Sequence, residues 1–114
     1  MWISLIGKIE IKMLTSKYFN MGKVVVTHGI NEVMTENSRF AAEVNLSLQR
    51  YAVKAWGNLD DEDKQVNEEA LKYPDDLYLL AAYETCMEKI YIITNRISEK
   101  AGDNVSTVCF PDER

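Results

Sequence analysis

The stretch WGNLDDEDKQVNEEALKY, residues 56 to 73, separates two segments of the chain that have different patterns. Gly57 and Asn58 predict the end of one helix, because both residues favour turns over helix. Asp60 is a favourable N-cap residue and predicts a second helix over about Asp61–Lys72. Acidic residues follow Asp60 at once, and the helix dipole favours them in a first turn. The stretch therefore predicts a break between two helices, of which the second is short and acidic.

The second helix offers few apolar side chains to the interior. Val66, Ala70 and Leu71 are its predicted inward residues, so most of its circumference is expected to face water. Trp56 lies where the two helices meet, and it has two interpretations. It either packs both helices onto the rest of the domain or, if exposed, forms the centre of an interface beside the charges.

The segment before this stretch predicts one strand and one long helix. Lys23–Thr27 (KVVVT) is apolar on both sides, as in a strand inside a sheet. Ile30–Met34 is expected to form one helical turn. Asn37 or Ser38 then caps a helix that runs to about Ala55, and its apolar residues recur at three- and four-residue steps. This predicted buried stripe consists of Phe40, Val44, Leu48, Tyr51, Ala52 and Ala55.

The segment after the stretch predicts three strands, at Leu77–Tyr83, Lys89–Thr94 and Val105–Phe110. The connection between the first two is short enough for a hairpin. Apolar residues fall on both faces of these two strands, so we expect helices on one face and the N-terminal strand or a partner over the other. The whole pattern predicts an α+β fold: a mainly antiparallel sheet of four to five strands with two principal helices.

Residues 1–20 have a different pattern from the rest of the chain. Apolar residues at the odd positions from Ile3 to Met13 alternate with mostly polar ones, which predicts a strand with one buried face. Met21 stands where a chain could also start, directly before the strand at Lys23–Thr27. We therefore expect residues 1–20 to be an N-terminal extension and residues 21–114 to be a single α+β domain.

The composition favours an acidic protein of the cytoplasm. The net charge is −5 over 114 residues, which disfavours direct binding to nucleic acid or to an anionic membrane and favours a protein partner with a basic surface. Cys86 and Cys109 are too few for a disulfide framework and suit a reducing compartment. The apolar opening WISLIG lacks the basic flank and the cleavage site of a secretory signal, and no apolar run reaches the roughly 18 residues of a spanning helix.

The candidate catalytic residues do not form a recognised motif. His28 is the only histidine, and a lone histidine in a turn with no partner at a fixed spacing favours a structural role. Nothing in the spacing of Cys86 or Cys109 places either thiol beside His28. Phosphate-binding glycine loops, the nucleophile elbow and the zinc-binding helix motif do not occur in the sequence. We therefore expect a protein without enzymatic activity and without a cofactor.

A calcium loop is the one metal site that the acidic spacing suggests. Asn58, Asp60, Glu62 and Glu69 follow the first, third, fifth and twelfth positions of such a loop. Asp63 stands where the loop needs a glycine, and aspartate does not readily take the left-handed conformation required there. The helix dipole explains the same acids without a metal, so no metal site is predicted.

Acidic residues are concentrated between Asn58 and Asp76, where eight carboxylates oppose two lysines and the formal charge is −6. One interpretation is a helix surface that simply faces water. The other is that the carboxylates occupy the place of phosphates and bind the basic groove of a nuclease. The last four acids are the first candidates, because capping does not explain them. The full set of candidate partner-binding residues is Trp56, Asp60, Asp61, Glu62, Asp63, Glu68, Glu69, Asp75 and Asp76.

Six segments carry a resemblance to a known group of proteins. They are Gly22-Lys23-Val24-Val25, Thr27-His28-Gly29, Trp56-Gly57-Asn58-Leu59-Asp60-Asp61-Glu62-Asp63-Lys64 with Asn67, Leu79-Leu80-Ala81-Ala82-Tyr83, Tyr91-Ile92-Ile93-Thr94, and Thr107 to Glu113. Together they resemble a family of small, largely uncharacterised proteins carried by plasmids, conjugative elements and phages. The resemblance covers residues 21–114, and its Trp-Gly segment is the most specific part. Asn58 replaces the family's usual aspartate, and Asn95-Arg96-Ile97-Ser98 replaces an acidic motif.

The resemblance implies a protein that travels with mobile DNA, where inhibitors of host defence nucleases are common. It implies no settled activity. We expect a non-enzymatic protein that inhibits a Cas effector or a restriction nuclease by direct contact, as an anti-CRISPR or anti-restriction protein does. The alternative is a structural or regulatory accessory protein of plasmid or phage maintenance that acts as a homodimer or larger homo-oligomer.

Overall fold

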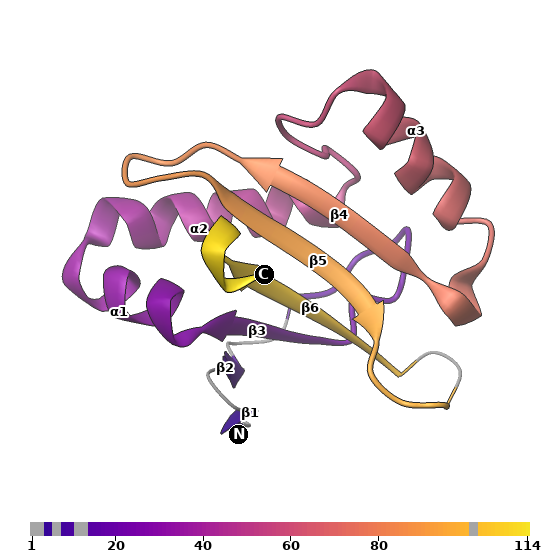
Figure 1. Ribbon diagram of the computed structural model, residues 1–114, viewed down its shortest axis with the longest axis horizontal. Coiled ribbons are helices and arrows are strands. Elements are labelled where there is room, and N and C mark those ends of the chain that lie inside the picture. Colours follow the sequence, from indigo (N-terminus) through magenta and orange to yellow (C-terminus); the bar gives the residue numbers. More distant parts are fainter. Residues whose placement is uncertain (1–3, 6–7, 11–13, 101–102) are drawn as a thin grey trace.

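Six strands form one sheet in the computed structural model, which describes residues 4–5, 8–10, 14–100 and 103–114 (Figure 1). Their order across the sheet is β1-β2-β3-β6-β5-β4. β3 and β6 run parallel, and the other described neighbours are antiparallel. The fold is therefore α+β with a mostly antiparallel sheet, as the sequence predicts. The strands are β1 (Ser4–Leu5), β2 (Lys8–Glu10), β3 (Lys23–Thr27), β4 (Tyr78–Tyr83), β5 (Ile90–Arg96) and β6 (Asn104–Cys109).

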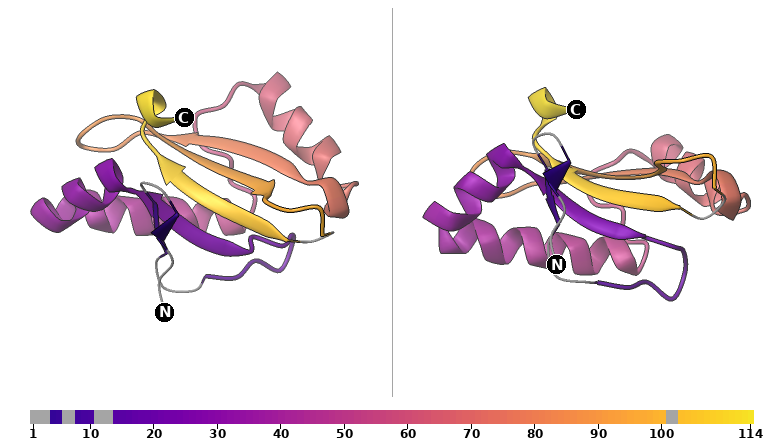
Figure 2. Two further views of the ribbon diagram at one scale, coloured as in Figure 1. Left: turned by 60° about the horizontal axis from the view of Figure 1, so that its bottom comes forward. Right: turned by 90° about the horizontal axis from the view of Figure 1, so that it is seen from below.

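Helices cover one face and one edge of this sheet. α1 and α2 lie together on one face, whereas the short C-terminal turn η2 projects from the other face (Figure 2). α3 stands beside β4, at the edge of the sheet (Figure 1). The helical elements are α1 (His28–Glu36), α2 (Ser38–Ala52), α3 (Asp61–Ala70) and the 3-10 turns η1 (Pro74–Asp76) and η2 (Pro111–Glu113).

Side-chain oxygens cap all three α-helices in the described part of the chain. Asn37 and Asp60 cap α2 and α3 and confirm two predicted caps. The prediction of a single helical turn at Ile30–Met34 is wrong, because α1 has nine residues. The Thr27 hydroxyl accepts a hydrogen bond from the Ile30 N–H, and the Ile30 side chain is fully buried. The cap and the buried side chain together stabilise a helix that is longer than the local sequence pattern predicts.

The N-terminal segment lies at the β3 edge of the sheet. Ser4 pairs with Ile9, so β1 and β2 form a hairpin and the single strand predicted across Ile3–Met13 is wrong for the described residues. β2 pairs with β3 and extends the sheet. It therefore does not cover the second face, which is where the sequence pattern predicted the N-terminal strand or a partner. The remainder of the predicted strand lies outside the described residues.

Residues 14–20 pack against the core. The ring of Phe19 meets that of Tyr51 edge-on at 5.5 Å between centroids and lies 6.1 Å from that of Trp56. The Ser16 hydroxyl donates to the Ala52 carbonyl at 2.6 Å. This part of the proposed extension thus contributes contacts to the domain of residues 21–114. That residues 1–20 are an addition to that domain stays a prediction.

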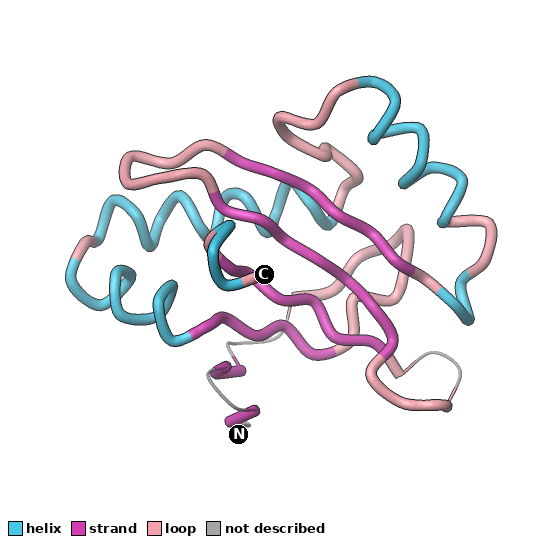
Figure 3. Tube along the Cα trace, viewed as in Figure 1, coloured by secondary structure: helices cyan, strands magenta, loops and turns pink. Residues whose placement is uncertain are grey.

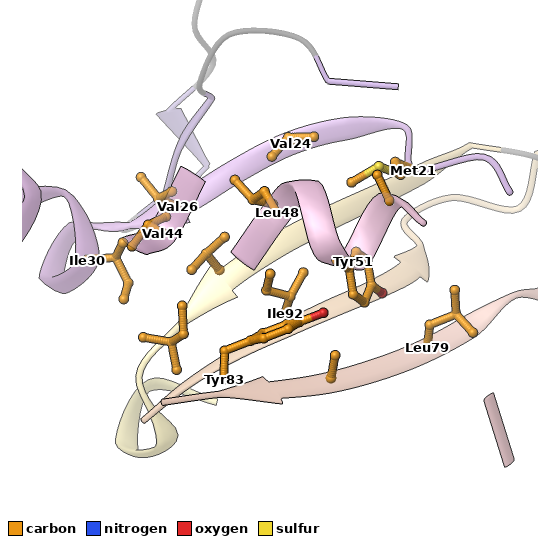
Figure 4. Packing of buried hydrophobic residues seen from close by; sticks show 14 of the residues in the cluster. Met21, Val24, Val26, Ile30, Val44, Leu48, Tyr51, Leu79, Tyr83 and Ile92 are labelled. Carbon is orange, nitrogen blue, oxygen red and sulfur yellow. The ribbon is translucent and has the colours of Figure 1, made fainter. Parts of the chain in front are cut away.

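The core lies between α2 and the sheet face that it covers. The predicted stripe of α2 is buried from Phe40 to Ala52. Figure 4 shows Val44, Leu48 and Tyr51 of this stripe over the sheet. Ala55 is exposed instead, because α2 ends at Ala52 and Lys54 takes a positive φ of 66°, which turns the chain out of the helix. The sheet residues that meet this stripe are Val24, Val26, Leu79, Ala81, Tyr83, Ile90, Ile92 and Val108.

One chain of buried hydroxyl groups crosses the core. Tyr51 donates to Thr94 Oγ1 at 2.7 Å, Thr94 and Ser106 share a hydrogen bond of 2.6 Å, and Ser106 donates to the Met21 carbonyl at 2.7 Å. Each hydroxyl is thus satisfied away from water, where an unpaired one would cost about 1–3 kcal/mol. These hydrogen bonds connect α2, β5, β6 and Met21 in the segment before β3, so they help to fix the position of the helix over the sheet.

The second face of the sheet is only partly covered. Val25, Thr107, Ile93 and Leu80 are register partners across it, from β3 to β4. Val25 and Thr107 are buried, Ile93 and Leu80 are half-buried, and Tyr78 is 49% exposed. Apolar side chains therefore reach solvent on this face near the β4 edge. No helix in the described part of the chain is long and apolar enough to cross a membrane.

We expect the protein to lose stability above about pH 10 through Tyr51. Burial raises the pKa of the Tyr51 phenol above its ordinary value of 10.0, and the hydrogen bond with Thr94 opposes this only in part. Between the two pKa values the folded protein keeps a proton that the unfolded chain has lost. The stabilisation is therefore complete below pH 10 and is lost as pH rises, by about 1.4 kcal/mol per pH unit.

Urea unfolding at several pH values from about 7 to 11 measures this slope. Tyr51→Phe should be less stable by about 1 kcal/mol at neutral pH, because it loses the hydroxyl bond, and should show a shallower alkaline fall. Tyr73→Phe is the control, because Tyr73 is 66% exposed and is not among the groups that act on the Tyr51 phenol, so the slope should stay unchanged. Equal alkaline slopes for all three proteins would contradict the prediction.

Candidate functional site

The loop after α2 carries the chain to the free edge of β4, where it pairs with the sheet (Figure 3). Gly57 forms a parallel bridge with Ala82, and the Asn58 N–H donates to the Ala82 carbonyl at 2.7 Å. Gly57 has a positive φ of 76°, and a Cβ there would lie 1.9 Å from the Ala82 oxygen. Only glycine fits this conformation and this close approach. The break predicted at Gly57 is thus also a contact with the sheet edge.

Asn67 continues the coverage of that edge from α3. Its Nδ2 donates to the Leu80 carbonyl at 2.7 Å, and its Oδ1 accepts from the Leu80 N–H at 3.2 Å. The side chain thus satisfies both backbone groups of Leu80, as a neighbouring strand would, and Asn67 is only 3% exposed. The prediction that Val66 points inward is wrong: Val66 is 59% exposed, because Asn67 occupies the buried face of α3.

Trp56 packs inside the domain. It is 4% exposed, and its ring meets that of Tyr51 at 5.5 Å between centroids. Its Nε1 donates to Glu68 Oε2 at 2.9 Å. The burial favours the packing interpretation and leaves no exposed indole for a partner. Trp56 and Glu68 together connect the loop after α2 to α3.

Five of the candidate acids have structural roles. Asp60 caps α3 by accepting from the Asp63 N–H at 2.8 Å, as predicted. Glu68 accepts from Trp56 and pairs with Lys54 at 3.5 Å. Glu69 pairs with Lys72 at 3.1 Å, and Asp76 pairs with Arg96 at 3.6 Å. Asp75 contributes only its backbone carbonyl, which accepts from Arg96 at 3.0 Å. Of the last four acids, which capping does not explain, Glu68, Glu69 and Asp76 thus have charged partners within the domain.

The first turn of α3 retains the free charge. Asp61, Glu62 and Asp63 are exposed and make no ion pair within the described residues. Val66 and Glu69 lie four and seven residues after Glu62, so these three residues share one side of the helix. Tyr73 follows the end of the helix and is 66% exposed. We define the outer stripe of α3 as Glu62, Val66, Glu69 and Tyr73 together with Asp61 and Asp63.

The candidate nucleophiles are not arranged as an activated pair. His28 is exposed at the start of α1, and Cys86 is exposed in the loop between β4 and β5. The Cys86 N–H donates to Glu43 at 2.8 Å. A hydrogen bond to the same carboxylate raises the pKa of the Cys86 thiol, which disfavours the thiolate that a nucleophile needs. Cys109 is buried in β6. Among the described residues no three His, Cys, Asp or Glu side chains are grouped to hold a metal.

Two other segments of the family resemblance meet at the C-terminus. The Thr27 hydroxyl donates to Glu113 Oε1 at 2.6 Å, and Glu113 Oε2 accepts from the Gly29 N–H at 3.2 Å. A Cβ on Gly29 would lie 2.5 Å from that carboxylate oxygen. The Thr-His-Gly and Pro-Asp-Glu segments thus hold η2 against the junction of β3 and α1. Glu113 was not among the predicted site residues, and its contacts are structural.

Comparisons of the chain with protein-family models, curated proteins and solved structures give no match. The family resemblance and the mobile-element setting that it implies stay predictions. The site is therefore defined by the contacts described above. These contacts separate the acidic segment into residues that hold α3 on the sheet and residues that face outward.

We expect Asn67→Ala to lower the free energy of unfolding by about 2–3 kcal/mol, because it leaves the Leu80 N–H and carbonyl unpaired. Urea unfolding measures the loss, and hydrogen exchange at the Leu80 amide should become faster. Gln65→Ala is the matched control: Gln65 is an exposed polar residue of the same helix, so the change should stay within about 0.5 kcal/mol. Equal stability of the two variants would show that Asn67 does not hold α3 on β4.

Proposed function

We propose that this protein is a non-enzymatic binding protein and that the outer stripe of α3 contacts a basic surface of a protein partner. The observation that carries the proposal is that Val66 and Tyr73 are exposed on and just after a helix whose first-turn carboxylates make no ion pair among the described residues. Charge alone is expected on a helix face that only meets water. Exposed aromatic and aliphatic side chains near such charges are typical of an interface.

The carboxylates determine the kind of partner. Asp61, Glu62 and Asp63 repel nucleic acid and anionic membranes and attract a basic protein surface. Such attraction speeds association and weakens as salt rises. Basic grooves that bind nucleic acid are a common surface of this kind. The concrete form of the proposal is inhibition of a Cas effector or a restriction nuclease in the cytoplasm by a protein of a mobile element. Its further support is the family resemblance, which is an association rather than a physical argument.

Two sets of substitutions separate the contributions to binding. Asp61→Asn, Glu62→Gln and Asp63→Asn, made together, should slow association with the partner about tenfold at low salt and flatten its salt dependence. Val66→Ser with Tyr73→Ser should instead speed dissociation about tenfold or more. Surface plasmon resonance against Cas effectors and restriction enzymes measures both rates, and cleavage assays measure inhibition.

Glu32→Gln, Glu36→Gln and Glu99→Gln, made together, are the control for the loss of three charges, because all three residues are exposed and lie outside α3. All variants are first compared by urea unfolding, since acids in the first turn stabilise a helix by about 0.3–1 kcal/mol each. Binding that is lost equally in the control would exclude the outer stripe. No binding to any of these nucleases at low salt would exclude their inhibition as the function.

A second candidate function rests on the second face of the sheet. Leu80 and Ile93 are half-buried there and Tyr78 is 49% exposed, so an apolar surface reaches solvent near the β4 edge. Such a surface favours a homodimer, as in a structural or regulatory accessory protein of plasmid or phage maintenance. This candidate does not use the outer stripe.

Light scattering after gel filtration tests this candidate. It predicts a dimer at about 0.1 mM protein that becomes a monomer on Ile93→Glu, because a carboxylate would be buried at the interface. The control is Ile97→Glu, because Ile97 is 47% exposed and lies beyond the end of β5. A monomer in the unchanged protein would exclude the second candidate.

A further inference from the structure

An open hollow of about 440 Å³ lies between the end of α2, the loop before α3 and the end of β4. Its volume falls in the range of sites for small molecules, roughly 300–1,000 Å³. It lies on the side of the molecule where α3 begins, and its residues do not belong to the outer stripe. The residues that line it are Arg50, Ala55, Trp56, Gly57, Asn58, Lys64, Tyr83 and Glu84.

The lining of the hollow is basic within an acidic protein. Arg50 comes from the last turn of α2 and Lys64 from α3, so two cations on different elements face one space. The chain has a net charge of −5, yet neither cation pairs with a carboxylate in the described residues. Arg39, Lys54, Lys72 and Arg96 do form such pairs. Glu84 is the only acid among the lining residues.

The floor of the hollow is rigid. Trp56 and Tyr83 are 4% and 3% exposed, and the Tyr83 hydroxyl donates to the Ala55 carbonyl. Gly57 lies so close to Tyr83 that a Cβ there would be only 2.9 Å from the ring. Burial raises the pKa of Tyr83, while the nearby charge of Arg50 opposes this shift. Arg50 is thus close enough to the hollow to act on a group at its floor.

We propose that this hollow binds the phosphate group of a small, hydroxyl-bearing molecule, such as a sugar phosphate or a nucleotide. The guanidinium of Arg50, the ammonium of Lys64 and the side-chain amide of Asn58 are donors on three separate segments, which suits a tetrahedral oxyanion. Glu84 is an acceptor on the same hollow and suits the hydroxyl groups of the ligand. The proposal uses none of the outer stripe, so it stands or falls independently of the proposed protein partner.

Amide chemical shifts in NMR spectra of the full chain test the site, with inorganic phosphate, ribose 5-phosphate and ribose as probes at low salt. Phosphate and ribose 5-phosphate should shift the Gly57 and Asn58 amides, and ribose should not. Arg50→Gln and Lys64→Gln should each weaken binding about tenfold or more, because each removes a charged hydrogen-bond donor. Glu84→Gln should strengthen binding of inorganic phosphate and reduce the advantage of ribose 5-phosphate over it.

Arg39→Gln and Lys72→Gln are the matched controls, because neither residue lines the hollow. Arg39 lies on α2, as Arg50 does, and Lys72 follows the end of α3, which carries Lys64. They should bind both phosphate probes as the unchanged protein does. Thermal unfolding checks that every variant is folded. The absence of shifts at Gly57 and Asn58 with about 10 mM of either phosphate probe would overturn the proposal. Shifts that persist when Arg50 and Lys64 are both replaced would also overturn it.

Discussion

The free edge of β4 is the constraint on which the second half of this structure depends. An edge strand presents unpaired N–H and carbonyl groups, which favour pairing with other chains unless something covers them. Gly57, Asn58 and Asn67 provide that cover, by backbone and by side chain. Because the loop before α3 and Asn67 within α3 are both held at this edge, the helix has one orientation. That orientation buries Trp56 and turns Val66 outward.

The sequence predicted the elements whose signals are local. The stripe of α2 from Phe40 to Ala52, the caps at Asn37 and Asp60 and the apolar runs of the last three strands all depend on near neighbours, and each is confirmed. The inward face of α3 was predicted wrongly, because a scale of apolarity ranks Val66 above Asn67. The spacing alone favours Asn67, which lies three and four residues before Ala70 and Leu71. Only the position of Leu80 across the sheet edge reveals why an amide is buried there.

The roles of the candidate site residues likewise depend partly on sequence neighbours and partly on residues that are distant in the sequence. Asp60 could be assigned from its place at a helix start, whereas the roles of Glu68 and Asp76 depend on Trp56 and Arg96, which are distant in the sequence. Several segments that carry the family resemblance make contacts with residues that are distant in the sequence. Gly57 and Asn67 hold the β4 edge, and Thr27 and Gly29 hold Glu113. The most specific motif of the chain therefore specifies how the domain is assembled.

Under the proposed function, a partner would be bound by residues that do not hold the domain together. α3 carries two such groups, and they have opposite charge. Its outer stripe has carboxylates and two exposed apolar side chains, while Lys64 of the same helix joins Arg50 at the hollow. At about physiological salt the screening length is about 8 Å, so each group acts mainly on what contacts it directly. One short helix can therefore present an acidic surface to a protein and a cation to a phosphate, because the sheet edge fixes which side of it faces each way.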